Sequence, residues 1–282
     1  MKKLLTSRDI LLLGLSGALD LFEEIKDPFY IVSKSYENMY GWVPEQYKKH
    51  NFMHLLWRSI KTGYIEKVEK NGEIFIQLTS QGNKRIIRDF PLLRLQKKSW
   101  DKKWRVAIFD IEEVKRNARD GLREKLKELG FGMIQKSVFI SPHDIAQDIT
   151  EFIKNSGLDE VVYIFVASNL ATGNAKWLAN KVWRLDNINE KYRGLIERIE
   201  REYLIVTHDR GKILNNTGIN ELVGKELNTH DKHKQDKSEL LRDLRSEYLG
   251  IIMTDPFLPK ELLPDDWLGD EVRKTIKKLP KL

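Results

Sequence analysis

Apolar residues in the first third of the chain recur at helical intervals. The clearest run has 3-4-3 spacing and consists of Leu12, Leu15, Leu19 and Phe22. Such spacing is typical of an amphipathic helix, which we predict over about residues 7–24. A second short helix is expected over 33–40, where Gly41 ends it. A third is expected over 44–62, beginning at a proline, whose missing amide hydrogen is not needed in a first turn, and ending before Gly63.

Two β-rich runs follow at 64–70 and 73–78, and Asn71 and Gly72 separate them. Both of these residues tolerate the positive φ angles of a tight two-residue turn, so the pattern predicts a β-hairpin. Three helices followed by a two-stranded wing are the element order of a winged helix-turn-helix. We therefore expect residues 1–94 to form a DNA-binding domain of this class.

The third predicted helix has one apolar and one polar side. At 100° per residue, the apolar side is formed by Phe52, Leu55, Leu56 and Ile60. The polar side offers guanidinium, ammonium, amide, imidazole and phenol groups, which can bind phosphates and base edges. The candidate DNA-binding residues are Tyr47, Lys48, Lys49, His50, Asn51, His54, Arg58 and Lys61, with Lys67 and Lys70 on the hairpin. For any single one of these residues, an ordinary solvated face is the alternative interpretation.

The middle third alternates between strand and helix patterns. The predicted elements are a strand at 104–111, a helix at 115–129, strands at 131–134 and 137–141, a helix at 145–156 and a strand at 160–167. This βαββαβ order is that of the ferredoxin-like split motif, which we place over residues 100–170.

The last third, residues 171–282, is predicted to be mainly helical. Helices are expected over 175–185, 189–207 and 239–250, and the polar segment 228–238 is expected to be a loop. Three tryptophans in this part are expected in the core, with a ligand cavity as the alternative: Trp177, Trp183 and Trp267. The fold class is therefore α+β, with a winged helix-turn-helix, a ferredoxin-like domain and a mainly helical C-terminal domain.

Charge and composition narrow the function classes. The net charge is +7, and residues 44–94 hold 10 Lys and Arg against 5 Asp and Glu, which favours a polyanion as partner of this region. The absence of cysteine excludes disulfides and thiolate metal sites and favours a cytoplasmic protein. The longest uncharged stretch near the start, 10–19, is far short of the ~20 residues of a membrane span.

Four segments carry a resemblance to a known family. Segments 104–113 (WRVAIFDIEE) and 129–142 (LGFGMIQKSVFISP) resemble the middle domain of the PaaX-like transcriptional repressors. Segments 182–186 (VWRLD) and 255–269 (DPFLPKELLPDDWLG) are similar to that family's third domain. Two departures limit what can be carried over. The sequence of the third predicted helix differs from the usual recognition-helix sequence of the family. Arg184 stands where an Asp is usual.

The resemblance implies a DNA-binding transcriptional regulator, expected to be a repressor that binds double-stranded operator DNA as a homodimer. The ferredoxin-like domain would pair two copies, and the helical domain would complete the dimer or sense a small-molecule effector. No catalytic residue, cofactor or metal ion is expected, and no membrane partner.

A second resemblance supplies the alternative function. The middle segment is similar to the small ferredoxin-like nuclease subunit of CRISPR adaptation, in which an Asp at the end of the first strand can bind a divalent metal across a dimer interface. Asp110 occupies the matching position. Magnesium chemistry requires several oxygen ligands, and one carboxylate per chain is sparse. We therefore favour the regulator over a metal-dependent nuclease, with Asp110 as a structural residue at the strand end.

Overall fold

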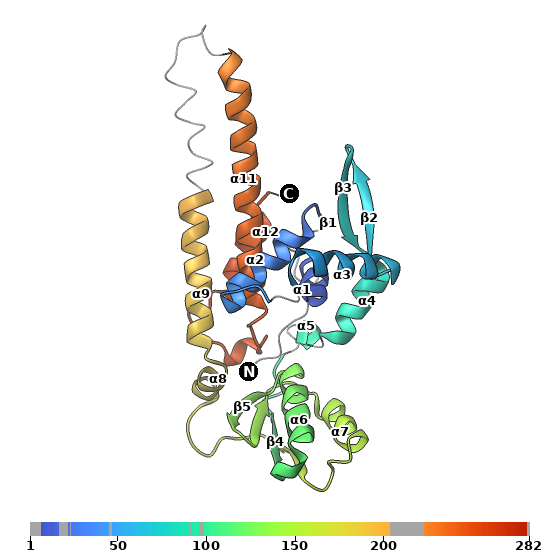
Figure 1. Ribbon diagram of the computed structural model, residues 1–282. Helices are drawn as coiled ribbons and strands as arrows, with labels where there is room; N and C mark the ends of the chain where they lie inside the picture. Colours follow the sequence, from blue (N-terminus) through green and yellow to red (C-terminus); the bar gives the residue numbers. More distant parts are fainter. Residues whose placement is uncertain are drawn as a thin grey trace. The chain divides into compact units, whose positions relative to one another are not determined.

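The computed structural model describes residues 7–16, 22, 24–44, 47–90, 92–95, 99–203 and 223–280 (Figure 1). Residue contacts divide the chain into two compact units. Unit 1 comprises residues 1–5, 87–187 and 256–267, and unit 2 comprises residues 6–86, 188–255 and 268–282. Helix and sheet are both present, which confirms the α+β class.

The N-terminal part of unit 2 contains helices and a three-stranded sheet. Its elements are α1 (Ser7–Gly14), β1 (Glu24–Ile25), α2 (Pro28–Tyr40), α3 (Lys49–Lys61), β2 (Ile65–Lys70), β3 (Glu73–Leu78) and α4 (Ser80–Asp89), which runs on into unit 1. Asp27 begins α2 by accepting a hydrogen bond from the Tyr30 amide at 3.0 Å, and Pro28 follows as the first helical residue. Gly41 ends α2 in the left-handed conformation, as expected from the sequence.

Three predicted boundaries are wrong. The first helix ends at Gly14 instead of residue 24, because the chain turns back there and the Phe22 amide donates to the Gly14 carbonyl at 3.3 Å. Residues 24–25 form β1, and residues 17–21 and 23 lie outside the described part. Helix α2 begins five residues earlier than expected, at Pro28. Helix α3 begins at Lys49, because the Tyr47 amide donates to the Pro44 carbonyl at 2.8 Å in a separate turn.

The predicted hairpin is confirmed. Strands β2 and β3 pair antiparallel from Ile65 opposite Leu78 to Lys70 opposite Glu73. Asn71 and Gly72 form the turn with φ angles of 53° and 76°, the positive values that a type I′ turn requires. Strand β1 adds to the outer edge of β3, which gives the order β1-β3-β2.

Unit 2 also contains C-terminal helices, one of which packs on the N-terminal helix α2. They are α9 (Leu185–Arg198), η3 (Ile199–Tyr203), α11 (Val223–Ile252) and α12 (Gly269–Lys278). Helix α11 contacts α2, and the approach is close because Gly250 leaves room for Asn38, whose Cβ would be 3.1 Å from a Cβ at position 250. Arg198 joins α9 to α11 through Asp243 at 2.7 Å and Glu247 at 2.5 Å. The expectation of a loop at 228–238 is wrong, since this segment lies within α11.

Unit 1 is built on a four-stranded antiparallel sheet. Its main elements are β4 (Trp104–Phe109), α6 (Arg116–Glu128), β5 (Gly132–Gln135), β6 (Val138–Ser141), α7 (Ala146–Asn155) and β7 (Val162–Ala167). The strand order β5-β6-β4-β7 and the βαββαβ succession confirm the expected ferredoxin-like arrangement. Buried Phe109, Leu122 and Phe139 contribute to the core between the sheet and these helices.

Four short elements complete unit 1: α5 (Leu92–Leu95), η2 (Glu113–Lys115), α8 (Ala175–Trp183) and η4 (Lys260–Leu262). Helix α8 packs on the sheet at Gly132, where a Cβ would come within 2.2 Å of the Val182 side chain and 2.6 Å of Trp183. The predicted C-terminal domain thus contributes α8 to unit 1 and α11 to unit 2. The three-domain division stays a prediction.

Candidate nucleic-acid interface

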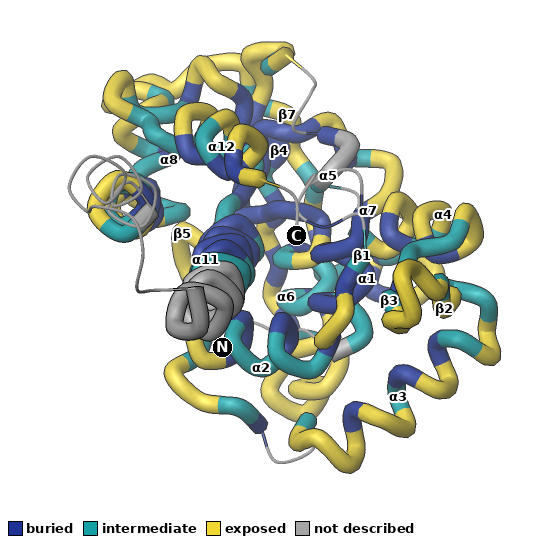
Figure 2. Tube along the Cα trace, turned by 90° about the horizontal axis from the view of Figure 1, so that it is seen from above, coloured by how far each residue is buried: buried dark blue, intermediate teal, exposed yellow. Residues whose placement is uncertain are grey.

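Helix α3 presents a basic outer surface and buries the opposite side. Phe52, Leu56 and Ser59 are buried, and Figure 2 shows the rest of the helix as largely exposed. The Ser59 hydroxyl is satisfied locally, because it donates to the Leu55 carbonyl at 2.8 Å. The helix has no Asp or Glu in its whole length. Its outer surface is therefore positively charged, and no carboxylate of the helix itself neutralises this charge.

The structure places most of the predicted binding residues on this exposed surface. They are Lys48, Lys49, His50, Asn51, His54, Arg58 and Lys61. The rings of His50 and His54 lie edge to face, 5.0 Å apart. Lys61 lies over the indole ring of Trp57 at 5.1 Å, a cation–π contact that fixes the direction of this long side chain.

Tyr47 does not belong to the helix. Its ring stacks on the buried Tyr36 at 5.0 Å and an interplanar angle of 13°, which leaves it half-buried. This stacking fixes the segment that leads into α3. Tyr47 still borders the α3 surface, since it contributes to the depression described next.

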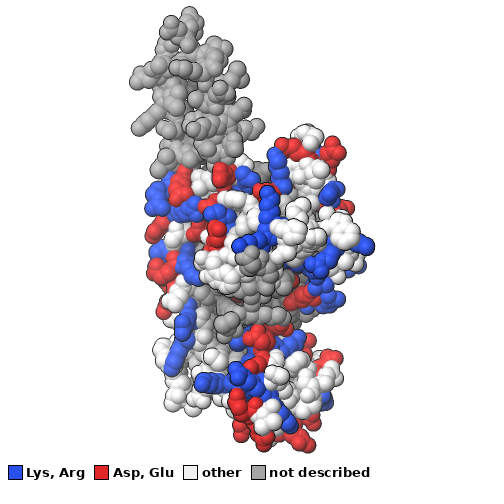
Figure 3. Space-filling model, in the orientation of Figure 1, with Lys and Arg blue, Asp and Glu red and all other residues white. Residues whose placement is uncertain are grey.

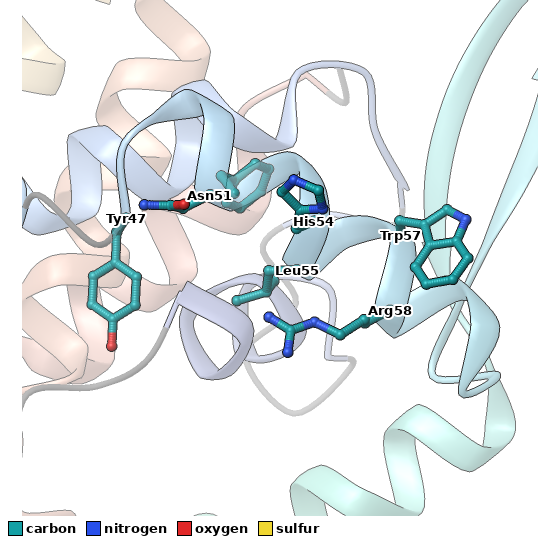
Figure 4. Close-up of a pocket in the computed structure, with 7 residues that line it drawn as sticks. Tyr47, Asn51, His54, Leu55, Trp57 and Arg58 are labelled. Carbon is teal, nitrogen blue, oxygen red and sulfur yellow. The ribbon is translucent and has the colours of Figure 1, made fainter.

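A shallow depression of about 600 Å³ lies along α3. Its lining residues are Tyr47, Asn51, Phe52, His54, Leu55, Trp57 and Arg58. Figure 4 shows the Arg58 side chain reaching back along the helix toward Leu55, while His54 and Trp57 leave the helix in other directions. The depression offers a guanidinium, an amide and an imidazole side by side, which are groups that bind base edges and phosphates.

The hairpin is less basic than the sequence interpretation supposed. It carries Glu66, Glu69 and Glu73 beside Lys67 and Lys70, and Figure 3 shows acidic side chains toward its tip. The Lys70 ammonium lies 2.5 Å from the Glu24 carboxylate, and Lys26 pairs with Glu73 at the same distance. These ion pairs join the hairpin to the segment around β1, so Lys70 already has an internal partner, and Lys67 is exposed.

Two exposed residues of α3 were missed in the sequence analysis. Trp57 is 60% exposed and Met53 is 54% exposed. A helical wheel places Trp57 outside the apolar side and Met53 at its edge, about 20° from Ile60, and this was the available signal.

Asp110 directly follows β4 and is exposed. Its backbone amide donates to the Val161 carbonyl at 3.1 Å, which ties the end of β4 to the start of β7. Within the described ranges, no group of three or more His, Cys, Asp and Glu side chains could hold a metal ion. Asp110 is therefore a carboxylate at a strand end that belongs to no such group in this part of the chain.

Trp177 and Trp183, two of the three tryptophans in the last third of the chain, have different environments. Trp183 lies near Trp104, with ring centroids 6.4 Å apart and the rings nearly parallel. Trp177 is 56% exposed, so its expected place in the core is wrong. No helix in the described part of the chain is both long and apolar enough to cross a bilayer.

Comparison with known proteins identifies the family. Residues 97–179 match the PaaX protein central Cas2-like domain, and residues 219–281 match the PaaX-like protein C-terminal domain. The chain belongs to the PaaX-like family. Three of the four segments quoted for the resemblance lie within these matches, and segment 182–186 lies between them.

Two individual proteins are similar to this PaaX-like chain. The Transcriptional repressor PaaX of Escherichia coli (strain K12) is 23% identical over 224 residues, which are 78% of this chain and 64% of that protein. The uncharacterized protein Rv0674 from Mycobacterium tuberculosis is 18% identical, and the structural match covers 96% of this chain and 92% of that chain with a TM-score of 0.48. The chain thus spans less than two thirds of its curated relative's length.

Proposed function

We propose that this protein is a transcriptional regulator, acting as a repressor, that binds operator DNA as a homodimer through α3. The observation that carries the proposal is the outer surface of α3, where Lys49, Arg58 and Lys61 are exposed and no acidic residue is present. The similarity to the repressor PaaX supports the same assignment. The proposed regulator acts in the cytoplasm and has no catalytic step and no cofactor.

The proposed contacts follow from the chemistry of the major groove, which admits an α-helix. Arg58 can bind guanine O6 and N7 or a phosphate, and Asn51 can make paired bonds to adenine. Lys49 and Lys61 are suited to phosphates, which fix position without reading sequence. The hairpin, acting as the wing, would approach the DNA backbone with Lys67, while Lys70 holds the hairpin to Glu24.

Pairing of two copies completes the proposal. Winged-helix regulators read half-sites related by two-fold symmetry, and a closed dimer provides the matching axis. We assign the pairing to the ferredoxin-like sheet of unit 1. A small-molecule effector that shifts the dimer between DNA-binding and non-binding forms belongs to the proposal as an expectation from the family.

Selection of bound DNA from a random pool, followed by titration of the selected duplex at several salt concentrations, tests the proposal. We expect enrichment of one sequence and a steep fall of affinity with salt, because each neutralised phosphate releases counterions. Arg58→Ala should weaken binding by ~1–3 kcal/mol if the side chain contacts a base edge. No enrichment, or binding that does not depend on salt, would overturn the proposed function.

A further inference from the structure

Two large apolar side chains are exposed on the surface that the proposed function assigns to DNA. Met53 and Trp57 are four residues apart in α3, so they lie on the same side of the helix, about 40° apart on a wheel of 100° per residue. Both are more than half exposed. An exposed apolar pair on an otherwise polar helix surface marks a contact site more often than a single exposed residue does.

The surroundings of this pair indicate the charge of its partner. Lys61 lies over the Trp57 ring at 5.1 Å, and His50, His54 and Arg58 are exposed on the same helix. With no carboxylate in α3, this surface is complementary to a polyanion. A partner that satisfies both properties must present apolar groups within a field of negative charge.

Duplex DNA has this combination in its major groove. The C5 methyl of thymine is the apolar group among the base edges there, and phosphates line both sides. We propose that Met53 and Trp57 contact thymine methyl groups and so select T·A pairs at defined positions of the bound sequence. This inference rests on the proposed function, because it requires α3 to enter the major groove.

The polar and the apolar residues of the exposed α3 surface would then contact different bases. Arg58 is about 100° from Trp57 on the wheel and Asn51 lies beyond it. The depression borders all three residues, whereas Met53 lies outside it. Those two polar residues are suited to purine edges, whereas Met53 and Trp57 are suited to thymine. Specificity would therefore come from both polar and apolar contacts on a single helix.

Replacement of thymine by uracil removes only the methyl group and tests the inference directly. The duplex selected by the full-length protein is resynthesised with deoxyuridine at each thymine in turn. We expect the native protein to bind about fourfold more weakly for each contacted methyl removed. Trp57→Ala should bind the thymine duplex more weakly and should no longer distinguish thymine from uracil at the affected position. Its salt dependence should stay unchanged, because no charge is removed.

Trp177→Ala is the matched control. Trp177 is 56% exposed on α8 in unit 1, and Lys181 lies over its ring at 4.9 Å, so it repeats the Trp57–Lys61 arrangement. This variant should discriminate between thymine and uracil as the native protein does. Circular dichroism and thermal melting of both variants check that each is folded.

The outcomes separate the inference from the function on which it rests. Salt-dependent, sequence-selective binding with no loss upon uracil substitution would overturn the inference and leave the proposed function standing. The inference would also be overturned if Trp57→Ala still distinguished thymine from uracil at every position. Absence of DNA binding by the native protein would overturn both.

Discussion

At the scale of single residues, α3 exposes both basic side chains and the large apolar side chain of Trp57. Helical periodicity assigns each position to a side of the helix, and Arg58, Lys61 and His54 are exposed as expected. Periodicity does not predict whether another element packs on a large apolar residue near the edge of the apolar side. That depends on which elements pack against the helix, and Trp57 stays 60% exposed with Lys61 of the same helix over its ring.

His143 shows the same dependence on tertiary surroundings. The ring is buried, its N–H donates to the Pro256 carbonyl, and its Nε2 has no protein partner. The pKa of His143 is lowered to about 4, chiefly by burial and also by the positive charge of Arg105, while the hydrogen bond to Pro256 acts in the opposite direction. The imidazole is therefore neutral in the folded protein at neutral pH, and it holds the 256–267 segment to the sheet of unit 1.

From the lowered pKa of His143 we predict that folding stability depends on pH. Because the folded-state pKa is depressed, the unfolded chain takes up a proton first as the pH falls below about 6.5, and stability declines from there toward pH 4. The loss should be ~2–3 kcal/mol in denaturant unfolding measured between pH 7 and pH 4. His143→Asn should be less stable at pH 7 and should lose less on acidification. His54→Asn, at an exposed position, is the control, and an identical pH dependence in native protein and His143→Asn would contradict the argument.

Asp110 separates the regulator from the nuclease alternative. Within the described residues its carboxylate belongs to no group of three or more potential metal ligands, so we expect DNA and RNA to remain intact on incubation with magnesium or manganese. Asp110→Asn should behave in the same way and should bind the selected duplex with native affinity. Gel analysis of labelled nucleic acid is sufficient for this measurement. Metal-dependent cleavage that disappears in Asp110→Asn would require the functional assignment to be replaced.

At the scale of elements, local turn chemistry was predictable and long-range pairing was not. Asn71 and Gly72 specify the turn of the hairpin locally, and the βαββαβ order follows from alternating strand and helix periodicities. Strand β1 has two residues and exists only because Glu24 pairs opposite Gln77, far away in sequence. No local pattern signals such a strand, and the helical spacing through Phe22 therefore led to an overlong first helix.

The ion pair of the hairpin gives an element-scale prediction. Lys70 is bound to Glu24 at 2.5 Å, so Lys70→Ala should alter how the hairpin is anchored rather than how DNA is held. We expect a change in DNA affinity of less than about twofold and a loss of folding stability of at most ~1 kcal/mol, as for other partly exposed pairs. Fluorescence anisotropy at three salt concentrations measures the effect, with Arg58→Ala as the comparison. If the salt slope fell by about 1 in Lys70→Ala, Lys70 would neutralise a phosphate in the complex.

At the scale of the whole molecule, the packing of α11 against α2 could not be predicted from the sequence pattern. Both helices were expected in separate domains, yet Gly250 lies against Asn38 and the two helices belong to one unit. The C-terminal helices therefore support the N-terminal part from which α3 projects. Periodicity shows that a helix has an apolar side, but it does not identify the helix that will cover that side.

The homodimer is a prediction for the whole molecule. One side of the unit 1 sheet exposes Ile108, Tyr163 and Phe165, which adjoin through the pairing of β4 with β7. Exposed apolar groups of this kind are costly in water and favour association. We expect light scattering at about ten micromolar to give twice the chain mass of 33.2 kDa, since a micromolar dimer requires roughly 8 kcal/mol of association free energy.

A charge placed on this sheet tests whether it is the pairing surface. Phe165→Asp should produce a folded monomer that binds the selected duplex more weakly, because the two half-sites would no longer be held together. Val114→Asp is the matched control, since Val114 is apolar and 94% exposed in η2, outside the sheet, and it should remain a dimer. The selected DNA should be an inverted repeat with half-site centres about one helical turn, or a multiple of it, apart. A native protein that scatters as a monomer, or a Phe165→Asp variant that stays dimeric, would remove the sheet from the proposed assembly.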